Sequence, residues 1–492
     1  MRFKLCTMAV SVAVLGGTSG CGKTGFELFP DDSPDQATTG IEERFWEGGG
    51  IGGLDDDSQL DAPLGPGSWI ARFGGSGNDE VLDIQLLSAG EIVILGRTQG
   101  TLDVSGTTVG SSGETQNFIA CFSTDFDLRW LRRFGDVAAS LELNELAVEN
   151  DRIYAVGELS GSLSTATAEL DVPSDRSHAL VIALDSRGTE RWVRTFPSTD
   201  RASGNQISAV DGVIAVSGGF RTDVDIAGTV YTTGSAYLAQ LSEAGTTLWS
   251  RAIEIDAIDD LDLGPDRTVG IAGATNLPTD LGDGELPFAG VRDAVFALFD
   301  DAGALLWARS YGGNERDEGT VVLLAPGGQA TFAGSFMGEV SFEGQIVNPE
   351  RSAAEITILR FDPSRTLSTT STFGGNWTDT LRELVPTADG DFAGVGDFFN
   401  EFVVGSELTL RTSAYDYFVA VFDDRGAPVW AVKVGTVLDD RFDIDIVAGP
   451  RGDVYIAGNV GAELEFGRFT YPNQGASDFF VARLVPEVRP VE

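Results

Sequence analysis

The segment 418–430, which reads Phe-Val-Ala-Val-Phe-Asp-Asp-Arg-Gly-Ala-Pro-Val-Trp, joins an apolar strand to a second strand through a short turn. A short, continuous apolar run that ends at turn residues is typical of a buried strand. A tight hairpin needs one residue with positive φ, and Gly426 adopts that conformation without steric cost. Trp430 then starts the second strand. A chain built from such hairpins is expected to be all-β.

The tryptophan of this segment recurs with a period near sixty residues. The strand-starting tryptophans are Trp69, Trp130, Trp192, Trp249, Trp307 and Trp430, and Thr369 takes the equivalent place between the last two. A second mark, a glycine that closes an apolar strand, recurs at Gly96, Gly157, Gly218, Gly273, Gly334, Gly396 and Gly458. Two independent marks that each occur seven times with one period indicate a repeat architecture.

Each repeat contains four short strands. In the first unit, strands are expected at residues 81–87, 91–96, 118–122 and 130–134, and no helical pattern exceeds one turn. Four strands per repeat is typical of a β-propeller blade, and a tryptophan ring can fill the wedge between two blades. The predicted fold class is therefore an all-β, seven-bladed β-propeller of four-stranded blades.

The two ends of the array complement each other. The last unit ends at residues 479–484 without a tryptophan strand, whereas the first unit begins with an extra one at residues 69–73. An N-terminal strand that completes the last blade would close the ring and remove two exposed strand edges. We predict closure of this kind.

The first twenty residues are interpreted as an export signal. A charged start precedes an apolar run at residues 5–17, which is too short for a stable transmembrane helix. The run ends in Thr-Ser-Gly-Cys at residues 18–21, which resembles the lipobox of bacterial lipoproteins. That resemblance implies that Cys21 is acylated, with palmitate for example, and that Gly22 directs the protein to the outer membrane. The family prefers Leu where Thr18 stands, so ordinary secretion remains the alternative.

The chain is expected to divide into four parts. Residues 1–20 form the signal peptide, and residues 21–68, rich in Gly, Asp, Pro and Ser without periodicity, form the acylated cysteine and a flexible acidic tether. Residues 69–486 form the propeller, and residues 487–492 form a tail. We expect a monomer on a tether at the membrane surface.

Composition excludes several classes of function. The 492 residues include 33 Lys and Arg against 75 Asp and Glu, a net charge of −42, which is unfavourable for binding nucleic acid. The three Cys and single His are too few for a disulfide framework or a Cys/His zinc site. His178 falls at the repeat position of Asp293, Asp416 and Asp478, so we interpret it as an ordinary strand residue. Cys121 is interpreted as a buried, inert thiol.

The repeats are similar to those of bacterial β-propeller lipoproteins. Their Asp-x-x-Gly-x-x-x-Trp turn, clearest at residues 423–430, also resembles the tryptophan-docking motif of quinoprotein-like propellers. That family includes dehydrogenases, which hold their quinone with adjacent cysteines and basic residues, and the propeller lipoprotein of the outer-membrane barrel assembly machinery. Here no two cysteines are adjacent, and Lys23 and Lys433 are the only lysines after the signal. We therefore expect no quinone cofactor.

A repeated aspartate is the candidate metal ligand. It follows the end of the tryptophan strand by six residues at Asp79, Asp259, Asp317, Asp379 and Asp440, with Ser140 and Ala202 in the other two blades. Five carboxylates around one channel mouth could bind Ca²⁺, which takes several oxygen ligands. The alternative is that each Asp closes a local turn with its own backbone.

The connections between second and third strands are long and differ among the blades. Residues 102–109 and 340–347 look like small hairpins that extend one rim of the ring. Long loops on a rigid scaffold often carry binding sites, although they could also merely extend the blade edge.

Two functions of different class remain. The first is a non-catalytic, lipid-anchored propeller that binds a protein or glycan partner at the cell envelope through its acidic loop face. The second is an envelope polysaccharide hydrolase or lyase that uses channel-mouth carboxylates, with or without Ca²⁺. The near-even spacing of the repeated Asp favours the first.

Overall fold

The computed structural model describes residues 67–75, 77–111, 115–135, 139–347, 353–375, 377–387, 390–404, 408–436, 444–461, 464–466, 469–471 and 477–486, and the strands β1 (Glu27–Leu28) and β2 (Ile41–Phe45). The predicted signal peptide, Cys21, Asp440 and the C-terminal tail lie outside these residues. Within the described part, no helix has the length and apolar character needed to cross a membrane.

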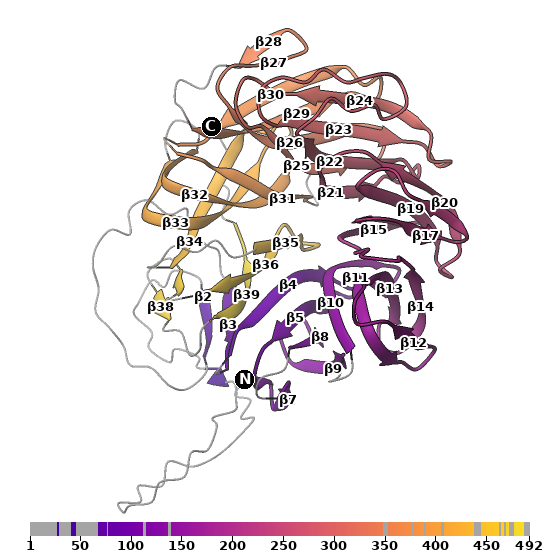
Figure 1. Ribbon diagram of the computed structural model, residues 1–492. Coiled ribbons are helices and arrows are strands. Elements are labelled where there is room, and N and C mark those ends of the chain that lie inside the picture. The colour runs from indigo at the N-terminus through magenta and orange to yellow at the C-terminus, as the bar shows by residue number, and fades with distance from the viewer. Residues whose placement is uncertain are drawn as a thin grey trace, which may run out of the picture.

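Seven antiparallel sheets are arranged in a ring around a central axis (Figure 1). Blade 1 contains β4 (Asp79–Leu86), β5 (Ile92–Thr98), β8 (Gln116–Phe122) and β9 (Leu128–Phe134). Blade 2 contains β10 (Ala139–Glu149), β11 (Arg152–Ser164), β13 (His178–Asp185) and β14 (Glu190–Phe196). Blade 3 contains β15 (Gln206–Val210), β16 (Val213–Gly219), β19 (Ala236–Ser242) and β20 (Thr247–Ile253). Blade 4 contains β21 (Ala257–Leu263), β22 (Val269–Thr275), β23 (Asp293–Phe299) and β24 (Leu305–Tyr311).

The remaining three blades complete the ring. Blade 5 contains β25 (Glu318–Leu324), β26 (Ala330–Met337), β29 (Ala354–Phe361) and β30 (Leu367–Phe373). Blade 6 contains β31 (Thr380–Pro386), β32 (Phe392–Val404), β33 (Leu408–Phe422) and β34 (Pro428–Thr436). Blade 7 contains β35 (Ile444–Ala448), β36 (Val454–Val460), β39 (Asp478–Leu484) and β3 (Ser68–Phe73). The predicted seven-bladed propeller is confirmed.

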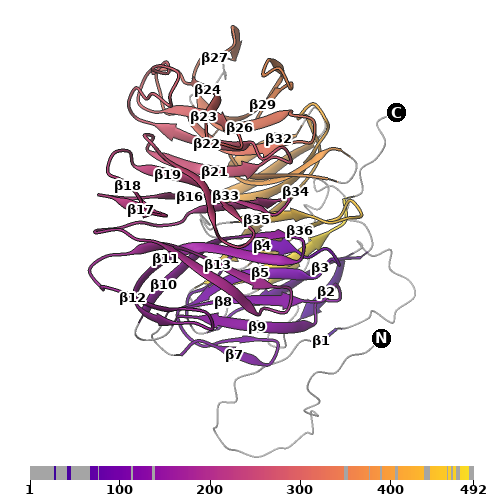
Figure 2. The ribbon, with the colours of Figure 1, turned by 90° about the vertical axis from the view of Figure 1, so that its right-hand side faces the viewer.

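The N-terminal strand closes the ring, as predicted. β3 is the outer strand of blade 7 and pairs antiparallel with β39, from Trp69 opposite Arg483 to Phe73 opposite Phe479. β2 pairs with β3 in parallel and β1 pairs with β2, so two short strands lie within the segment for which we expected a tether. In Figure 2, the N-terminal strand β3 lies beside the C-terminal strands of blade 7.

The hydrophobic core consists of seven clusters, one in each wedge between neighbouring blades. The wedge between blades 7 and 1 holds Trp69, whose ring centroid lies 4.6 Å from that of Phe126. Each blade therefore buries its apolar faces only by packing against two neighbours.

Three of the repeated tryptophans, Trp130, Trp192 and Trp249, pack against the turn glycine of the following blade. The Nε1 of Trp130 donates to the carbonyl of Ser186 (2.8 Å), and that of Trp192 donates to the carbonyl of Glu243 (3.0 Å). A Cβ on Gly188 would lie 2.7 Å from the ring of Trp130. The turn glycine is thus required both for its positive φ, +72°, and for the close approach of the preceding blade's tryptophan.

Gly303 tests this double requirement. Its φ is +78°, and an added Cβ would lie 2.7 Å from the ring of Trp249, whereas Gly344 has a similar φ of +89° and nothing within 4 Å. Gly344→Ala is expected to cost only the backbone strain, about 1 kcal/mol. Gly303→Ala is expected to cost a further 1–3 kcal/mol or so from overpacking. Urea unfolding of the two variants measures the difference, and equal losses would contradict the docking role.

Small hairpins extend the rim where predicted. Residues 102–109 form β6 (Leu102–Val104) and β7 (Thr107–Val109), and residues 340–347 form β27 (Val340–Phe342) and β28 (Gln345–Val347). Two further hairpins are β17 (Val224–Ile226) with β18 (Thr229–Tyr231) and β37 (Leu464–Phe466) with β38 (Phe469–Tyr471). In blade 2, β12 (Glu169–Val172) instead pairs with a lengthened β11.

Candidate functional site at the channel mouth

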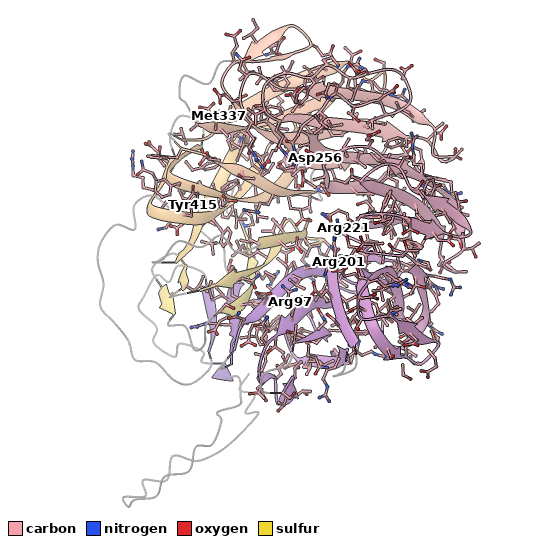
Figure 3. All side chains as sticks on the ribbon, in the orientation of Figure 1. Arg97, Arg201, Arg221, Asp256, Met337 and Tyr415 are labelled. Carbon is pink, nitrogen blue, oxygen red and sulfur yellow. The ribbon has the colours of Figure 1, made fainter. Side chains whose placement is uncertain are left out.

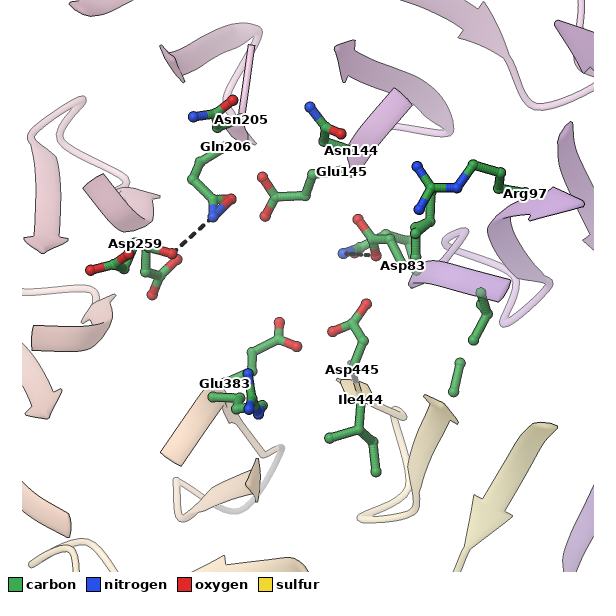
Figure 4. A pocket seen from close by; sticks show the side chains of 16 residues that line it. Asp83, Arg97, Asn144, Glu145, Asn205, Gln206, Asp259, Glu383, Ile444 and Asp445 are labelled. Atoms are coloured by element: carbon green, nitrogen blue, oxygen red, sulfur yellow. Dashed lines mark hydrogen bonds between the residues drawn. The ribbon is translucent and has the colours of Figure 1, made fainter. Parts of the chain in front are cut away.

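A polar cavity of about 390 Å³ lies at the mouth of the central channel (Figure 4). Its lining comes from every blade except the fifth, mainly from the inner strands. Asn144, Asn205, Gln206 and Asp259 contribute polar side chains, and Arg97 and Arg382 stand at the rim. Both arginines are neutralised, because Arg97 pairs with Glu80 (2.6 Å) and Arg382 with Asp397 (2.6 Å).

Five carboxylates, which we call the carboxylate ring, occupy one register position of the inner strands. The members are Asp83, Glu145, Asp260, Glu383 and Asp445. Each pairs with the residue that precedes the marker glycine of its blade, as Asp83 does with Leu95 and Asp445 does with Ala457. The same position holds Gln206 in blade 3 and Val321 in blade 5. In Figure 4, the labelled acids surround an open centre.

Every member of the carboxylate ring accepts a backbone N–H from the next blade. The donor to Glu145 is Ile207 (2.6 Å), and the donor to Asp260 is Val322 (2.7 Å). The remaining pairs are Asp83 with Leu146, Glu383 with Ile446 and Asp445 with Ile84. An inner strand has no strand partner on its channel side, so these N–H groups need another acceptor. The ring therefore joins neighbouring blades at their inner edges.

Burial raises the pKa of every ring carboxyl. It raises the pKa of Glu383 to about 8 and that of Asp260 to about 7. The pKa values of Asp83, Glu145 and Asp445 lie well above the usual range, first because of burial and then because of a neighbouring ring carboxylate. The Asp445 side chain hydrogen-bonds to those of Asp83 and Glu383, which requires shared protons. At neutral pH the ring thus carries fewer than five negative charges.

The repeated aspartates predicted as metal ligands lie in separate turns. Asp79, Asp317 and Asp379 are fully buried. Each accepts the N–H of a glycine four residues earlier, at 2.6, 2.7 and 2.5 Å, and so closes the turn that enters its own blade. Burial raises the pKa of Asp379 to about 8 and that of Asp317 to about 6. The structure does not bring these three together.

These bonds have the geometry of the local-turn alternative, and Ca²⁺ binding stays a prediction. Among the residues that the structure describes, no group of three or more His, Cys, Asp or Glu side chains is arranged to hold a metal ion. The fifth predicted ligand, Asp440, lies outside the described ranges.

Asp259 does not share the repeat position of Asp79. The register aligns Ile258 with Val81, both opposite a marker glycine, so Asp256 takes the place of Asp79. The reason is that the connection from β20 to β21 is shorter than the one from β3 to β4. Asp259 is instead the extra residue of a β-bulge, exposed at the channel mouth, where its carbonyl accepts the Gln206 side chain (2.8 Å). Figure 3 labels Asp256, which directly precedes β21.

Two other sequence interpretations can be compared with the structure. His178 lies at the register position of Asp293, Asp416 and Asp478, two residues before the partner of the marker glycine. Cys121 is buried, and burial raises the pKa of its thiol to about 12. Both agree with the expected structural roles.

Sequence reasoning missed the carboxylate ring. Its members differ in residue type, and a bulge next to most of them interrupts the strand alternation. A signal was nevertheless present in the spacing to the marker glycines. Asp83, Asp260, Glu383 and Asp445 each stand 13 residues before the marker glycine of their blade, and Glu145 stands 12 before.

No family model matches the chain, and no curated protein matches it. Among solved structures, it is similar to the WD40 β-propeller domain of Doa1, with a TM-score of 0.43 and 10% identity over 85% of this chain and 96% of that one. It is also similar to the Dos1 propeller (TM-score 0.41, 8% identity, 86% and 95% covered). A third is a catalytically inactive virginiamycin B lyase from Staphylococcus aureus, solved with quinupristin (TM-score 0.38, 9% identity, 84% and 98% covered).

The cavity lining is polar, and its carboxyls are tied to the backbone. The residues lining the cavity include no Ser, Thr, Cys or His. One oxygen of each ring carboxyl is already occupied by a backbone N–H. What the mouth presents to solvent is a set of amides, the exposed acid Asp259 and two paired arginines.

Proposed function

We propose that this chain is a non-catalytic, lipid-anchored propeller of the cell envelope that binds a protein or glycan partner through its acidic loop face. The observation that supports the proposal is the arrangement of the channel mouth. There the carboxylate ring, whose members accept backbone N–H groups, lies beneath an exposed polar rim. A closed ring holds this rim rigid, so little conformational entropy is lost when a partner binds.

The anchor follows from the lipobox-like residues ending at Cys21 and from the tether after them. A flexible segment of that length has a root-mean-square reach of roughly 35 to 40 Å, which lets the propeller search for a partner near the outer membrane. The acidic rim favours partners with basic groups and disfavours nucleic acid.

Site-specific photo-cross-linking in cells tests both parts. A benzophenone side chain at Asn205, on the channel mouth, is expected to give a discrete adduct whose yield falls with added salt and with Asp259→Asn. The matched control is Asp301, an exposed residue of the β23–β24 turn on the opposite face. Cys21→Ala is expected to release the protein from the membrane fraction. Equal adducts from both faces would contradict the binding face, and unchanged fractionation would contradict the anchor.

A further inference from the structure

Two blades contain a buried carboxylate that is matched by a cation on the adjacent outer strand. In blade 7, Asp478 on β39 pairs with Arg72 on β3, and in blade 6, Asp416 on β33 pairs with Lys433 on β34 at 3.4 Å. Both acids are almost completely buried. A carboxylate removed from water needs such a partner, because burial without one is costly.

Blade 4 keeps the carboxylate and lacks the cation. Asp293 occupies the position of Asp416 and Asp478, and Ser310 occupies that of Lys433 and Arg72, as the strand register shows. Asp293 is only 2% exposed. Its Oδ2 accepts the N–H of Ala289 (2.8 Å). Burial raises the pKa of Asp293, and the neighbouring Ser310 hydroxyl lowers it only in part, while its buried Oδ1 has no hydrogen bond of normal geometry. A serine is too short and neutral to replace an ammonium or guanidinium group.

Arg309, which lines the same cavity as Asp293, is already engaged elsewhere. The Nε of Arg309 donates to Glu343 (2.9 Å), and its Nη1 donates to the carbonyl of Ala308 (2.8 Å). Its guanidinium also lies over the ring of Trp307, 5.3 Å from the centroid. Arg309 is therefore held away from Asp293 by three interactions.

Asp293 and Ser310 line a cavity of about 360 Å³ between the long loop of blade 4 and the hairpin β27–β28 of blade 5. Phe288, half-buried, gives the cavity an apolar wall, and Tyr311, whose hydroxyl donates to Glu343 (3.0 Å), gives it a polar one. The lining thus combines two carboxylates, one paired arginine and two aromatic rings. Such a lining fits an apolar chain that ends in a positive charge, which is what Lys433 supplies inside blade 6.

We propose that the Asp293 cavity binds an alkylammonium group, either of a free amine or of a lysine side chain on a partner. The group takes the place that Lys433 and Arg72 fill in the two cation-containing blades, with its ammonium on Asp293 Oδ1 and its methylene chain along Phe288. The inference rests on the comparison of blades and is independent of the lipid anchor and of the channel mouth.

The test uses the full chain with butylammonium as the probe, followed by calorimetric titration and by melting temperature. Saturable binding and a raised melting temperature are expected, because a ligand that binds only the folded state stabilises it. Asp293→Asn is expected to weaken binding at least about tenfold, since a charge-assisted bond is lost.

Ser310→Lys separates binding from folding. The new ammonium is expected to satisfy Asp293 from within, so this variant should lose butylammonium binding while melting at a higher temperature than the unliganded parent. The matched control is Thr195→Lys in blade 2. It places the same side chain at the same register position, paired with Leu180, in a blade that has His178 in place of the aspartate, and it should not raise the melting temperature. A Ser310→Lys variant that melts lower, or still binds the probe, would overturn the proposal.

Parallel titrations distinguish the sources of the ligand. A terminally blocked Gly-Lys-Gly peptide that binds as well as butylammonium supports a lysine side chain, and a peptide that does not bind supports a free amine. KCl or CaCl₂ that gives the same Asp293-dependent stabilisation would identify a metal-cation site and overturn the proposal. Cross-linking at Asn205 is unaffected by any of these results, so failure here and failure of the proposed function are distinguishable.

Discussion

Ala71→Asp is expected to open the propeller ring. Ala71 is completely buried in the middle of the closing strand β3, opposite Val481 and within the cluster that joins blades 7 and 1. An unpaired carboxylate there costs about 3–5 kcal/mol, which is a large part of the stability of an ordinary domain. Loss of β3 also uncovers the edge of β39, and exposed strand edges promote association.

Calorimetry and light scattering measure the two consequences. We expect a strongly lowered melting temperature together with an increase in mass. The matched control is Leu306→Asp, which introduces the same side chain on the outer strand of blade 4 at a position 36% exposed. Surface changes of this kind usually alter stability by about 0.5 kcal/mol or less. An Ala71→Asp variant that melts like this control and keeps its mass would show that closure by β3 contributes little.

Glu383→Gln is expected to flatten the pH dependence of stability. The pKa of Glu383 is about 8 in the folded chain, raised by burial from its ordinary value of 4.5. Between these two values the folded state binds the extra proton, so the free energy of unfolding falls as pH rises from about 5 to about 8. The slope from one such group is at most about 1.4 kcal/mol per pH unit. Gln removes the ionisation and still offers an oxygen to the Ile446 N–H.

Urea unfolding at pH 5, 6, 7 and 8 compares the slopes. The wild-type chain should lose more stability across this range than Glu383→Gln, and the variant should be the more stable at pH 8. Asp362→Asn is the control, since the pKa of Asp362 is lowered by hydrogen bonds from Ser364 and Thr366 and its titration falls below this range. Parallel slopes for wild type and Glu383→Gln would mean that Glu383 ionises freely within the channel.

For the candidate site, the sequence predicted repeated acids at the channel mouth. It did not predict which acids lie together there. Asp79, Asp317 and Asp379 were correctly aligned by counting because their blades have equal connections. Asp259 was placed wrongly because a shorter connection before β21 shifts its register. Sequence spacing identifies equivalent positions only when the loops of all blades have equal length. The hydrogen-bond register between strands identifies them whatever the loop length.

The sequence by itself determined the number of blades, the strands within them and the closing strand. These follow from local requirements that recur in every repeat: apolar runs for strands, a positive-φ glycine in the turn and a tryptophan for the wedge. Only the tertiary structure decided which side chains face each other across blades. The carboxylate ring and the unmatched Asp293 arise from residues brought together by strand pairing and ring closure, and their burial and charge balance depend on neighbours that are distant in sequence.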